Sequence, residues 1–197
     1  MSQHLLNLLR SRWHRCLGKT TREYQRLLYI LAEYEAIDLR PGEVSKWRKR
    51  YLAIRGVRFG VPYYIGRGFW LLNGRRFSFG DRCSFGEFAR IMDHGPINVG
   101  DDFIAATGLQ INSGTHDPVT LESRAVPISI GNRVWCGANV TIIAGSTIGD
   151  DVVIGAGSLV RSAIPSESIA VGVPARVVRS FSRRDMPFIK WSETCSS

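Results

Sequence analysis

The sequence predicts an all-β solenoid that follows an N-terminal helical region. The first observation behind this is an apolar residue at every sixth position between residues 130 and 160. The second is a glycine directly after four of these six residues. A helix repeats every 3.6 residues and a strand every two, so a period of six indicates a chain that turns a corner every six residues. The six positions and their glycines are Ile130, Cys136, Ile142, Ile148, Ile154 and Val160, with Gly131, Gly137, Gly149 and Gly155.

Three such hexads make one turn of a triangular prism, so residues 130–147 and 148–165 are each expected to form one coil. The rhythm begins irregularly near residue 56 and slips by two residues at Val99. We expect the repeat glycines to adopt backbone angles that other residues resist. The rhythm breaks over residues 112–127, which is too long for a corner, so a projecting loop is predicted there. Insertions in solenoids map to the working face.

The chain therefore divides into a basic helical extension (1–55), a solenoid domain (56–178) and a C-terminal tail (179–197). Within the extension, one amphipathic helix is predicted before residue 18. A second is predicted to start at the capping box formed by Thr20 and Glu23, and to end at the Pro-Gly pair that begins at residue 41.

Charge and cysteine content limit the function classes. The net charge is +9, and residues 1–55 hold twelve Lys or Arg against five Asp or Glu. A basic amphipathic helix can contact the inner face of a membrane or pack on its own domain or a neighbouring subunit, and we favour packing. No motif that reads nucleic acid is found, and no apolar run is long enough to span a bilayer. Four cysteines without CxxC spacing and the lack of a secretory signal indicate a reduced, cytoplasmic protein.

The segment from Ile111 to Val178 resembles the hexapeptide-repeat O-acetyltransferases, the family of galactoside and maltose acetyltransferases. The similarity is carried by Asn-Ser-Gly-Thr-His at residues 112–116, Val-Trp-Cys-Gly at 134–137 and Gly-Val-Pro-Ala-Arg at 172–176. The resemblance implies a left-handed parallel β-helix of hexapeptide repeats. It also implies a homotrimer, with acetyl-CoA bound between neighbouring subunits and no metal.

His116 takes the position of the family's catalytic histidine. A sugar hydroxyl is a poor nucleophile while it keeps its proton, and a neutral imidazole can accept that proton as the oxygen attacks the thioester. The attack creates an oxyanion, and the resemblance assigns the backbone N–H of Ala138 as the hydrogen-bond donor to it. Glu122, in the same loop, is a candidate to orient His116.

The resemblance also assigns residues to the donor. The pantetheine arm of acetyl-CoA would run along Gly137, Ala138 and Ala156, with the ring of Trp135 as a wall. Coenzyme A carries phosphates, which guanidinium groups bind well. The arginines assigned to its phosphates and adenine are Arg161, Arg176 and Arg179.

The acceptor residues suggested by the resemblance are Glu87, Asp93 and His94. The run from residue 93 to 96, Asp-His-Gly-Pro, also has the composition of a turn at the register slip, so both interpretations stay open. The basic N-terminal extension looks more like the acetyltransferases of capsule, lipopolysaccharide or exopolysaccharide assembly. This favours a bacterial cell-surface polysaccharide or its precursor as the saccharide acceptor.

Other functions stay open at this point. Within the same class, the acceptor could be the amine of a nucleotide-linked amino sugar. Hexapeptide solenoids also form zinc carbonic anhydrases, which need three histidines around one metal, whereas only His94 and His116 lie in the solenoid. A solenoid without catalytic activity could serve as a binding scaffold.

Overall fold

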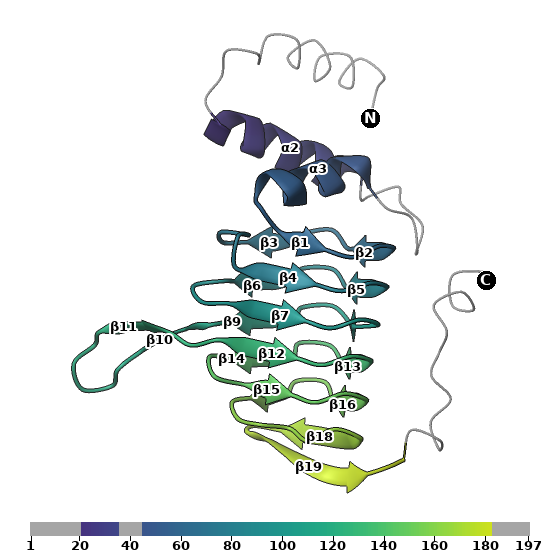
Figure 1. Cartoon of the computed structure of the whole chain (residues 1–197), viewed down its shortest axis with the longest axis vertical. Helices are drawn as coiled ribbons and strands as arrows, with labels where there is room; N and C mark the ends of the chain where they lie inside the picture. Colours follow the sequence, from purple (N-terminus) through teal and green to yellow (C-terminus); the bar gives the residue numbers. More distant parts are fainter. Residues whose placement is uncertain (1–20, 36–44, 183–197) are drawn as a thin grey trace.

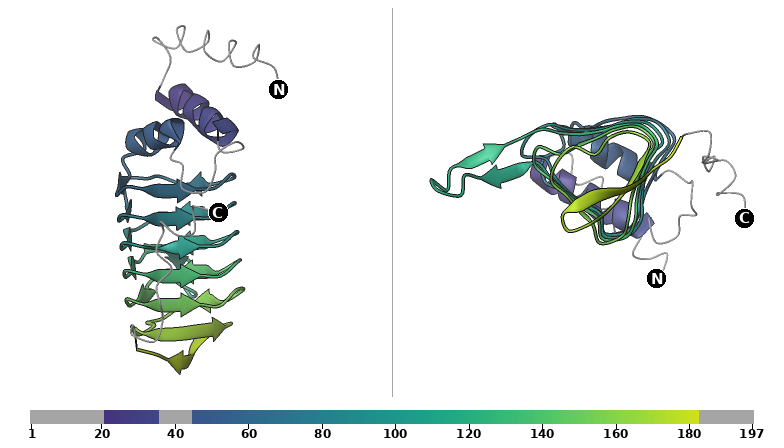
Figure 2. Two further views of the ribbon diagram at one scale, coloured as in Figure 1. Left: turned by 90° about the vertical axis from the view of Figure 1, so that its right-hand side faces the viewer. Right: turned by 90° about the horizontal axis from the view of Figure 1, so that it is seen from below.

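The computed structural model describes residues 21–35 and 45–182. In that part of the chain, short strands stack into a solenoid, with two helices at one end and an antiparallel strand pair at the other (Figure 1). Seen along the stack, the coils are roughly triangular, and each coil gives one strand to each of three parallel sheets (Figure 2). The predicted parallel β-solenoid with a preceding helical region is confirmed.

We name the three sheets faces A, B and C in the order in which the chain visits them. Face A contains β1 (Arg58–Phe59), β4 (Phe77–Phe79), β7 (Ile97–Val99), β12 (Ile128–Ile130) and β15 (Thr147–Ile148). Face B contains β2 (Tyr63–Ile65), β5 (Cys83–Phe85), β8 (Ile104–Ala105), β13 (Val134–Cys136), β16 (Val152–Ile154), β18 (Ser168–Gly172) and the antiparallel β19 (Ala175–Ser180). Face C contains β3 (Trp70–Leu71), β6 (Arg90–Met92), β9 (Gln110–Asn112), β14 (Thr141–Ile143) and β17 (Leu159–Val160).

Coil length explains the rhythm of the sequence. In the later coils Ile130 pairs with Ile148, so one coil takes 18 residues, as three hexads predict. In the earlier coils Phe79 pairs with Val99, so one coil takes 20 residues. The two extra residues lie at the corner between faces C and A, because Ile91 and Val99 are eight residues apart there, whereas the equivalent Ile142 and Ile148 are six apart. The slip of two residues at Val99 is therefore a longer corner.

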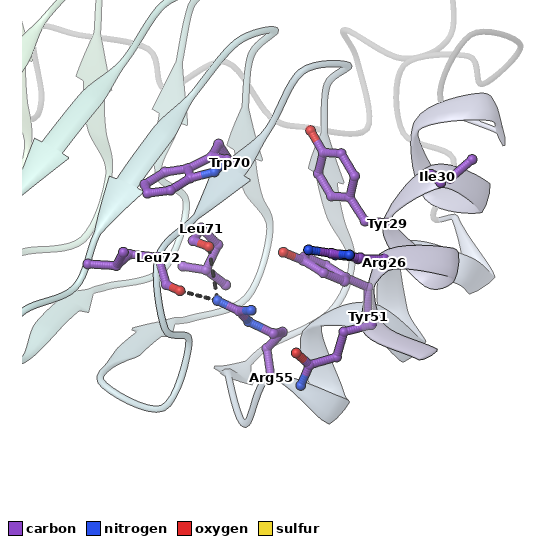
Figure 3. Close-up of a pocket in the computed structure, with 9 residues that line it drawn as sticks. Arg26, Tyr29, Ile30, Tyr51, Arg55, Trp70, Leu71 and Leu72 are labelled. Atoms are coloured by element: carbon purple, nitrogen blue, oxygen red, sulfur yellow. Dashed lines mark hydrogen bonds between the residues drawn. The ribbon is translucent and has the colours of Figure 1, made fainter. Parts of the chain in front are cut away.

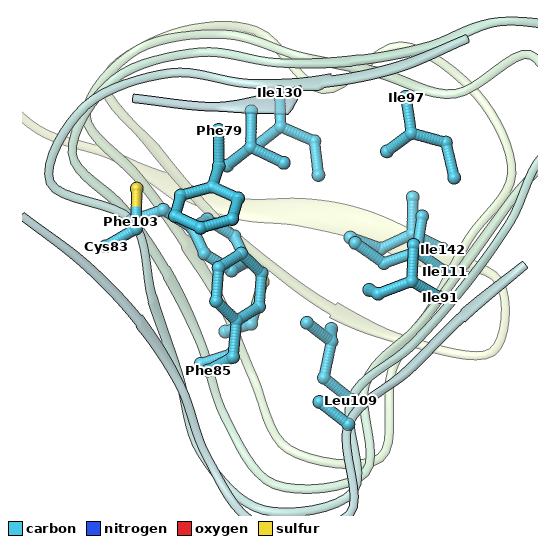
Figure 4. Close-up of a cluster of buried hydrophobic side chains, with 14 of the residues drawn as sticks. Phe79, Cys83, Phe85, Ile91, Ile97, Phe103, Leu109, Ile111, Ile130 and Ile142 are labelled. Atoms are coloured by element: carbon cyan, nitrogen blue, oxygen red, sulfur yellow. The ribbon is translucent and has the colours of Figure 1, made fainter. Parts of the chain in front are cut away.

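The interior of the prism is filled by the sixfold residues. All six positions between Ile130 and Val160 are buried, with exposed fractions of 3% or less. In the wider early coils, phenylalanines take the place of the isoleucines (Figure 4). The ring centroids of Phe79 and Phe85 are 5.2 Å apart, and those of Phe85 and Phe103 are 5.3 Å apart. Burying each such side chain contributes about 1.5–3 kcal/mol, so the stack is stable without a wide core.

The repeat glycines are required by the close approach of successive coils. A Cβ on Gly131 would collide with a side-chain oxygen of the next coil, and one on Gly137 would lie 2.6 Å from the backbone nitrogen of Ala156. Within the described chain, none of the four repeat glycines has a positive φ. Left-handed angles occur instead at Arg133 (56°) and Asn139 (55°). The expectation about glycine backbone angles was therefore wrong, and steric space is the reason for the glycines.

A ladder of side-chain oxygens fastens the corners between faces A and B. Each oxygen accepts the backbone N–H of the equivalent residue in the preceding coil, at 2.7–3.0 Å. The ladder satisfies donors that a tight corner would otherwise leave unpaired. Its members, from the first coil onward, are Asp81, Asp101, Asn132, Asp150 and Ser166.

The helical end contains α2 (Thr21–Glu35) and α3 (Lys46–Ile54). The sequence prediction ended the helices at the Pro-Gly pair, and α3 begins after it. Ser45 caps α3, because its Oγ accepts the N–H of Arg48 at 2.9 Å. Residues 1–20, which carry the other predicted helix, lie outside the described residues.

A buried ion pair ties the helices to the first coil. Arg48 is 1% exposed, and its Nη2 lies 2.8 Å from Oε1 of Glu33. Oε2 of the same carboxylate accepts the N–H of Gly68 at 2.6 Å, and the Arg48 guanidinium lies 5.7 Å from the ring of Phe69. Leu28 of α2 is fully buried in the same core, so α2 packs on its own domain. No helix in the described ranges has the length and apolar content to cross a membrane.

Candidate active site

A hairpin projects from the solenoid at the corner between faces C and A. It consists of β10 (Gly114–His116) and β11 (Ser123–Ala125), inserted between β9 and β12 (Figure 1). The right-hand view in Figure 2 shows it extending away from one corner of the prism. The antiparallel register places His116 opposite Ser123. The segment 112–127 is therefore an ordered strand pair that carries His116 beyond the surface of the coils.

The tip of the hairpin is a turn organised by Asp117. Its Oδ1 accepts the backbone N–H groups of Val119 and Thr120 at 2.9 and 3.0 Å. Its Oδ2 lies 2.8 Å from Nη2 of Arg124 on the returning strand. The N–H donors of Thr120 and Val119 lower the pKa of Asp117, because they stabilise the carboxylate. The turn is thus held from both strands by one charged side chain.

His116 is exposed, and one ring nitrogen has a defined partner. Nδ1 lies 3.0 Å from the backbone oxygen of Leu121. A carbonyl oxygen only accepts hydrogen bonds, so Nδ1 carries the proton in the neutral ring and Nε2 keeps a lone pair. Leu121 has a left-handed φ of 59°, which belongs to the same turn. The orienting group is therefore this carbonyl, and the suggestion of Glu122 for that role was wrong.

The root of the hairpin is held by contacts with the C–A corner of the preceding coil. Ser113 is fully buried, and its Oγ accepts the N–H of Gly95 at 2.8 Å. A Cβ on Gly114 would lie 2.5 Å from a ring carbon of His94, so that imidazole lies directly against the hairpin. His94 and His116 therefore lie at the same C–A corner, in adjacent coils.

Asp93 has a structural environment. It is fully buried, and its carboxylate accepts the backbone N–H groups of Asn73 and Gly74 at 2.7 and 2.8 Å. These contacts fasten the C–A corner of the preceding coil. The segment from residue 93 to 96 is therefore a corner, which was one of the two interpretations left open, and the Asp93 carboxylate faces the backbone.

The residues assigned to the oxyanion and the pantetheine arm lie along the corner between faces B and C. Gly137 and Ala138 follow β13, and Ala156 takes the equivalent place one coil later. The carbonyl of Ala138 accepts the N–H of Gly157 at 2.8 Å. Within residues 45–182, the N–H groups of Ala138 and Ala156 donate no hydrogen bond. This corner therefore offers a column of backbone donors to a bound molecule.

Trp135 lies on the outer surface of face B, next to this corner. Its side chain is 51% exposed, and its register partners are Ile104 and Val153 in the adjacent coils. Glu87 occupies the same B–C corner two coils earlier and is exposed. The assigned arginines are exposed at the far end of the stack, where Arg161 follows β17 and Arg176 and Arg179 lie on β19.

The site residues are divided between two corners of one chain. His116 and His94 are at the C–A corner, and Ala138, Ala156 and Glu87 are at the B–C corner. One copy of the chain therefore does not bring His116 next to Ala138. Among residues 21–35 and 45–182, no group of three or more His, Cys, Asp and Glu side chains could hold a metal ion.

Comparisons with known proteins identify the family. Residues 127–162 match the family model described as bacterial transferase hexapeptide (six repeats). A protein of Escherichia coli K12, named for O-acetyl transfer in lipopolysaccharide biosynthesis, is 34% identical over 64% of this chain and 72% of its own length. The chain belongs to the hexapeptide-repeat transferase family. This confirms the resemblance seen in the sequence.

Two further relatives of this hexapeptide-repeat transferase are named for acetyl transfer. The galactoside O-acetyltransferase of Escherichia coli K12 is 38% identical over 61% of this chain, which spans 65% of that enzyme's length. A solved structure of galactoside acetyltransferase in complex with coenzyme A superposes with a TM-score of 0.60 at 29% identity, covering 86% of each chain. These names support the prediction of an acyltransferase.

The sequence analysis missed three residues of the hairpin: Asp117, Leu121 and Arg124. Asp117 did carry a signal, because an Asp-Pro pair initiates turns. The carbonyl of Leu121 carried none, since its role depends on a backbone angle that leucine seldom adopts.

Proposed function

We propose that this chain is an acetyl-CoA-dependent O-acetyltransferase that acts on a sugar hydroxyl, with His116 as the general base. The observation that carries the proposal is the contact between Nδ1 of His116 and the carbonyl of Leu121. It leaves Nε2 as a proton acceptor on an exposed, braced hairpin. The relatives named for O-acetyl transfer support a hydroxyl acceptor rather than an amine.

His116 acts in a direct transfer within a ternary complex. Nε2 accepts the hydroxyl proton as the sugar oxygen attacks the thioester carbonyl. A carbon–oxygen bond forms, the carbon–sulfur bond breaks, and the imidazolium returns the proton to the departing thiolate. The free N–H of Ala138 donates to the oxyanion that forms during the attack. No acyl-enzyme is needed.

The B–C corner fits the donor. The pantetheine arm carries amides, and the unpaired N–H groups of Ala138 and Ala156 supply donors along one line, where Gly137 leaves space. Trp135 offers an exposed ring beside that line. Arg161, Arg176 and Arg179 add positive charge near the end of the stack for the phosphates. The coenzyme A complex of galactoside acetyltransferase supports coenzyme A as the ligand.

A homotrimer would complete the site. His116 and Ala138 lie at different corners, so a neighbouring copy must bring its B–C corner to the hairpin. The hairpin tip carries exposed apolar residues, Val119 at 88% and Leu121 at 72%. The outward column of face B is largely apolar as well, and such surfaces mark interfaces. Its apolar members are Tyr64, Ile104, Trp135, Val153 and Ile169.

The acceptor in this proposal is a bacterial cell-surface polysaccharide or its precursor. The relative named for lipopolysaccharide biosynthesis supports this class of saccharide. Glu87 and His94 present polar groups to it, while Asp93 acts through the corner that it holds.

The test is thiol release from acetyl-CoA in the presence of a saccharide panel. His116→Ala is expected to lower turnover by about 10²–10⁴-fold, while calorimetry shows unchanged affinity for coenzyme A. Glu122→Gln serves as the control, because that exposed side chain lies next to Leu121 in the same turn. It should keep turnover within about twofold. Full activity in His116→Ala would refute the proposal.

A further inference from the structure

A pocket lies between the two helices and the first coil, away from the residues assigned above. Its volume is about 590 Å³, within the range of sites for small molecules. Figure 3 shows α2 and α3 on one side and the end of β3 on the other. The lining residues that matter here are Arg26, Tyr29, Tyr51, Arg55, Trp70 and Leu72.

The charge of this pocket selects an anion. Arg26 and Arg55 line it, and no lining residue in the described part of the chain carries a carboxylate. Nη2 of Arg55 donates to the carbonyls of Leu71 and Leu72, which fixes the guanidinium at the floor. Nε of Arg55 is buried and has no hydrogen-bond partner among the described residues.

The rings of this pocket select a flat or ring-shaped group. Tyr29 and Tyr51 come from the helices, and Trp70 faces them from β3 (Figure 3). The Trp70 side chain is 38% exposed, and the guanidinium of Arg90 lies 5.9 Å from its ring centroid. Aromatic rings pack well against the C–H faces of sugars, and tyrosine and tryptophan add a polar edge. Charge and rings together fit an anionic saccharide.

The pocket is aligned with the hairpin along face C. Trp70 pairs with Arg90, which pairs with Gln110, so these three side chains form one exposed column. Gln110 begins β9, and the hairpin comes directly after that strand. Adjacent parallel strands are about 4.8 Å apart, so two coils separate pocket and hairpin by about 10 Å along the stack. His116 follows Gln110 by six residues, which adds up to about 20 Å of extended chain away from the stack, so an oligosaccharide of several units is needed to reach it.

We propose that this pocket binds an anionic unit of the saccharide acceptor, either a sugar phosphate or a uronic acid. A unit further along the same glycan then reaches His116 by way of the column of Trp70, Arg90 and Gln110. The inference rests on the proposed function, because it assigns a substrate class to the same enzyme. Arginine suits both anions, since its fork of donors matches phosphate and carboxylate oxygens.

Calorimetry on the full chain tests the pocket with four probes: glucose 1-phosphate, galacturonic acid, glucose and inorganic phosphate. The two anionic sugars should bind more tightly than glucose or phosphate alone, and the stronger of them identifies the anion. Arg26→Glu should weaken that binding about tenfold or more. Arg58→Glu is the matched control, because Arg58 is exposed on face A and does not line the pocket; it should leave binding unchanged.

A parallel assay separates this inference from the proposed function. Thiol release with a neutral methyl glycoside should be the same in Arg58→Glu and the unaltered chain. If acetyl transfer occurs but neither anionic sugar binds, the pocket assignment is overturned and the function stands. If binding occurs without acetyl transfer to any saccharide, the function fails. Equal binding of inorganic phosphate and glucose 1-phosphate would also overturn the saccharide assignment.

Discussion

Glu33→Gln is expected to release the helical end from the solenoid. The carboxylate faces Arg48, which is 1% exposed, across 2.8 Å, and it also accepts the N–H of Gly68. A glutamine keeps the shape but removes the charge, so a buried guanidinium is left uncompensated. Breaking a buried pair in this way costs about 3–5 kcal/mol. The loss should fall on α2, α3 and the first coil, because the pair joins only these elements.

Native-state hydrogen exchange measures this cost locally. In Glu33→Gln, amides of α2, α3 and β2 should lose about 3–5 kcal/mol of protection, while amides of β13 and β16 keep theirs. Glu23→Gln is the matched control, since Glu23 is an exposed carboxylate on the same helix. The double change Glu33→Leu with Arg48→Met should restore much of the protection, because apolar residues can replace a buried pair. Unchanged exchange in Glu33→Gln would refute the reasoning.

Three other predictions concern the hairpin and the core. Asp117→Asn removes the ion pair with Arg124, so turnover should fall about tenfold while affinity for coenzyme A is unchanged; a fall in affinity alone would contradict a positioning role. Burial raises the pKa of the Cys83 and Cys136 thiols to about 12, so the folded protein should resist thiol reagents at pH 8 once Cys16 and Cys195, which lie outside the described residues, are changed to serine. In the unfolded chain the Cys136 thiol ionises near its ordinary pKa of 9.0, so its contribution to the free energy of unfolding should be lost as pH rises from about 9 to about 12. Alkaline denaturation of Cys136→Ala, compared with the unaltered chain, measures this loss.

The period of six was enough to predict the prism, because each of its residues points inward in the structure. Ile130, Cys136 and Ile142 lie on faces A, B and C of one coil, as three hexads require. Helix α3 lies inside the predicted helical extension (1–55), but it was not predicted as a separate helix, because a Pro-Gly pair ends one element and carries no information about what begins after it. The Ser45 cap was the available signal for that helix.

The candidate site was only partly predictable for a different reason. His116 could be chosen from its motif, but its orienting group is the Leu121 carbonyl, and backbone carbonyls have no residue signature. The resemblance suggested Asp93 for the acceptor site, yet the residue is buried and its carboxylate accepts three backbone N–H groups at a corner. Packing between coils decides whether such a carboxylate faces the backbone or a ligand, and the sequence pattern does not contain that information.

The tautomer of His116 is the most direct test of the mechanism, and ¹⁵N NMR of the imidazole measures it. The geometry predicts a proton on Nδ1 and a bare, pyridine-like Nε2 in the neutral ring. A Leu121→Gly control keeps the carbonyl and should keep that tautomer. A neutral His116 with its proton on Nε2 would contradict the assignment of this nitrogen as the base.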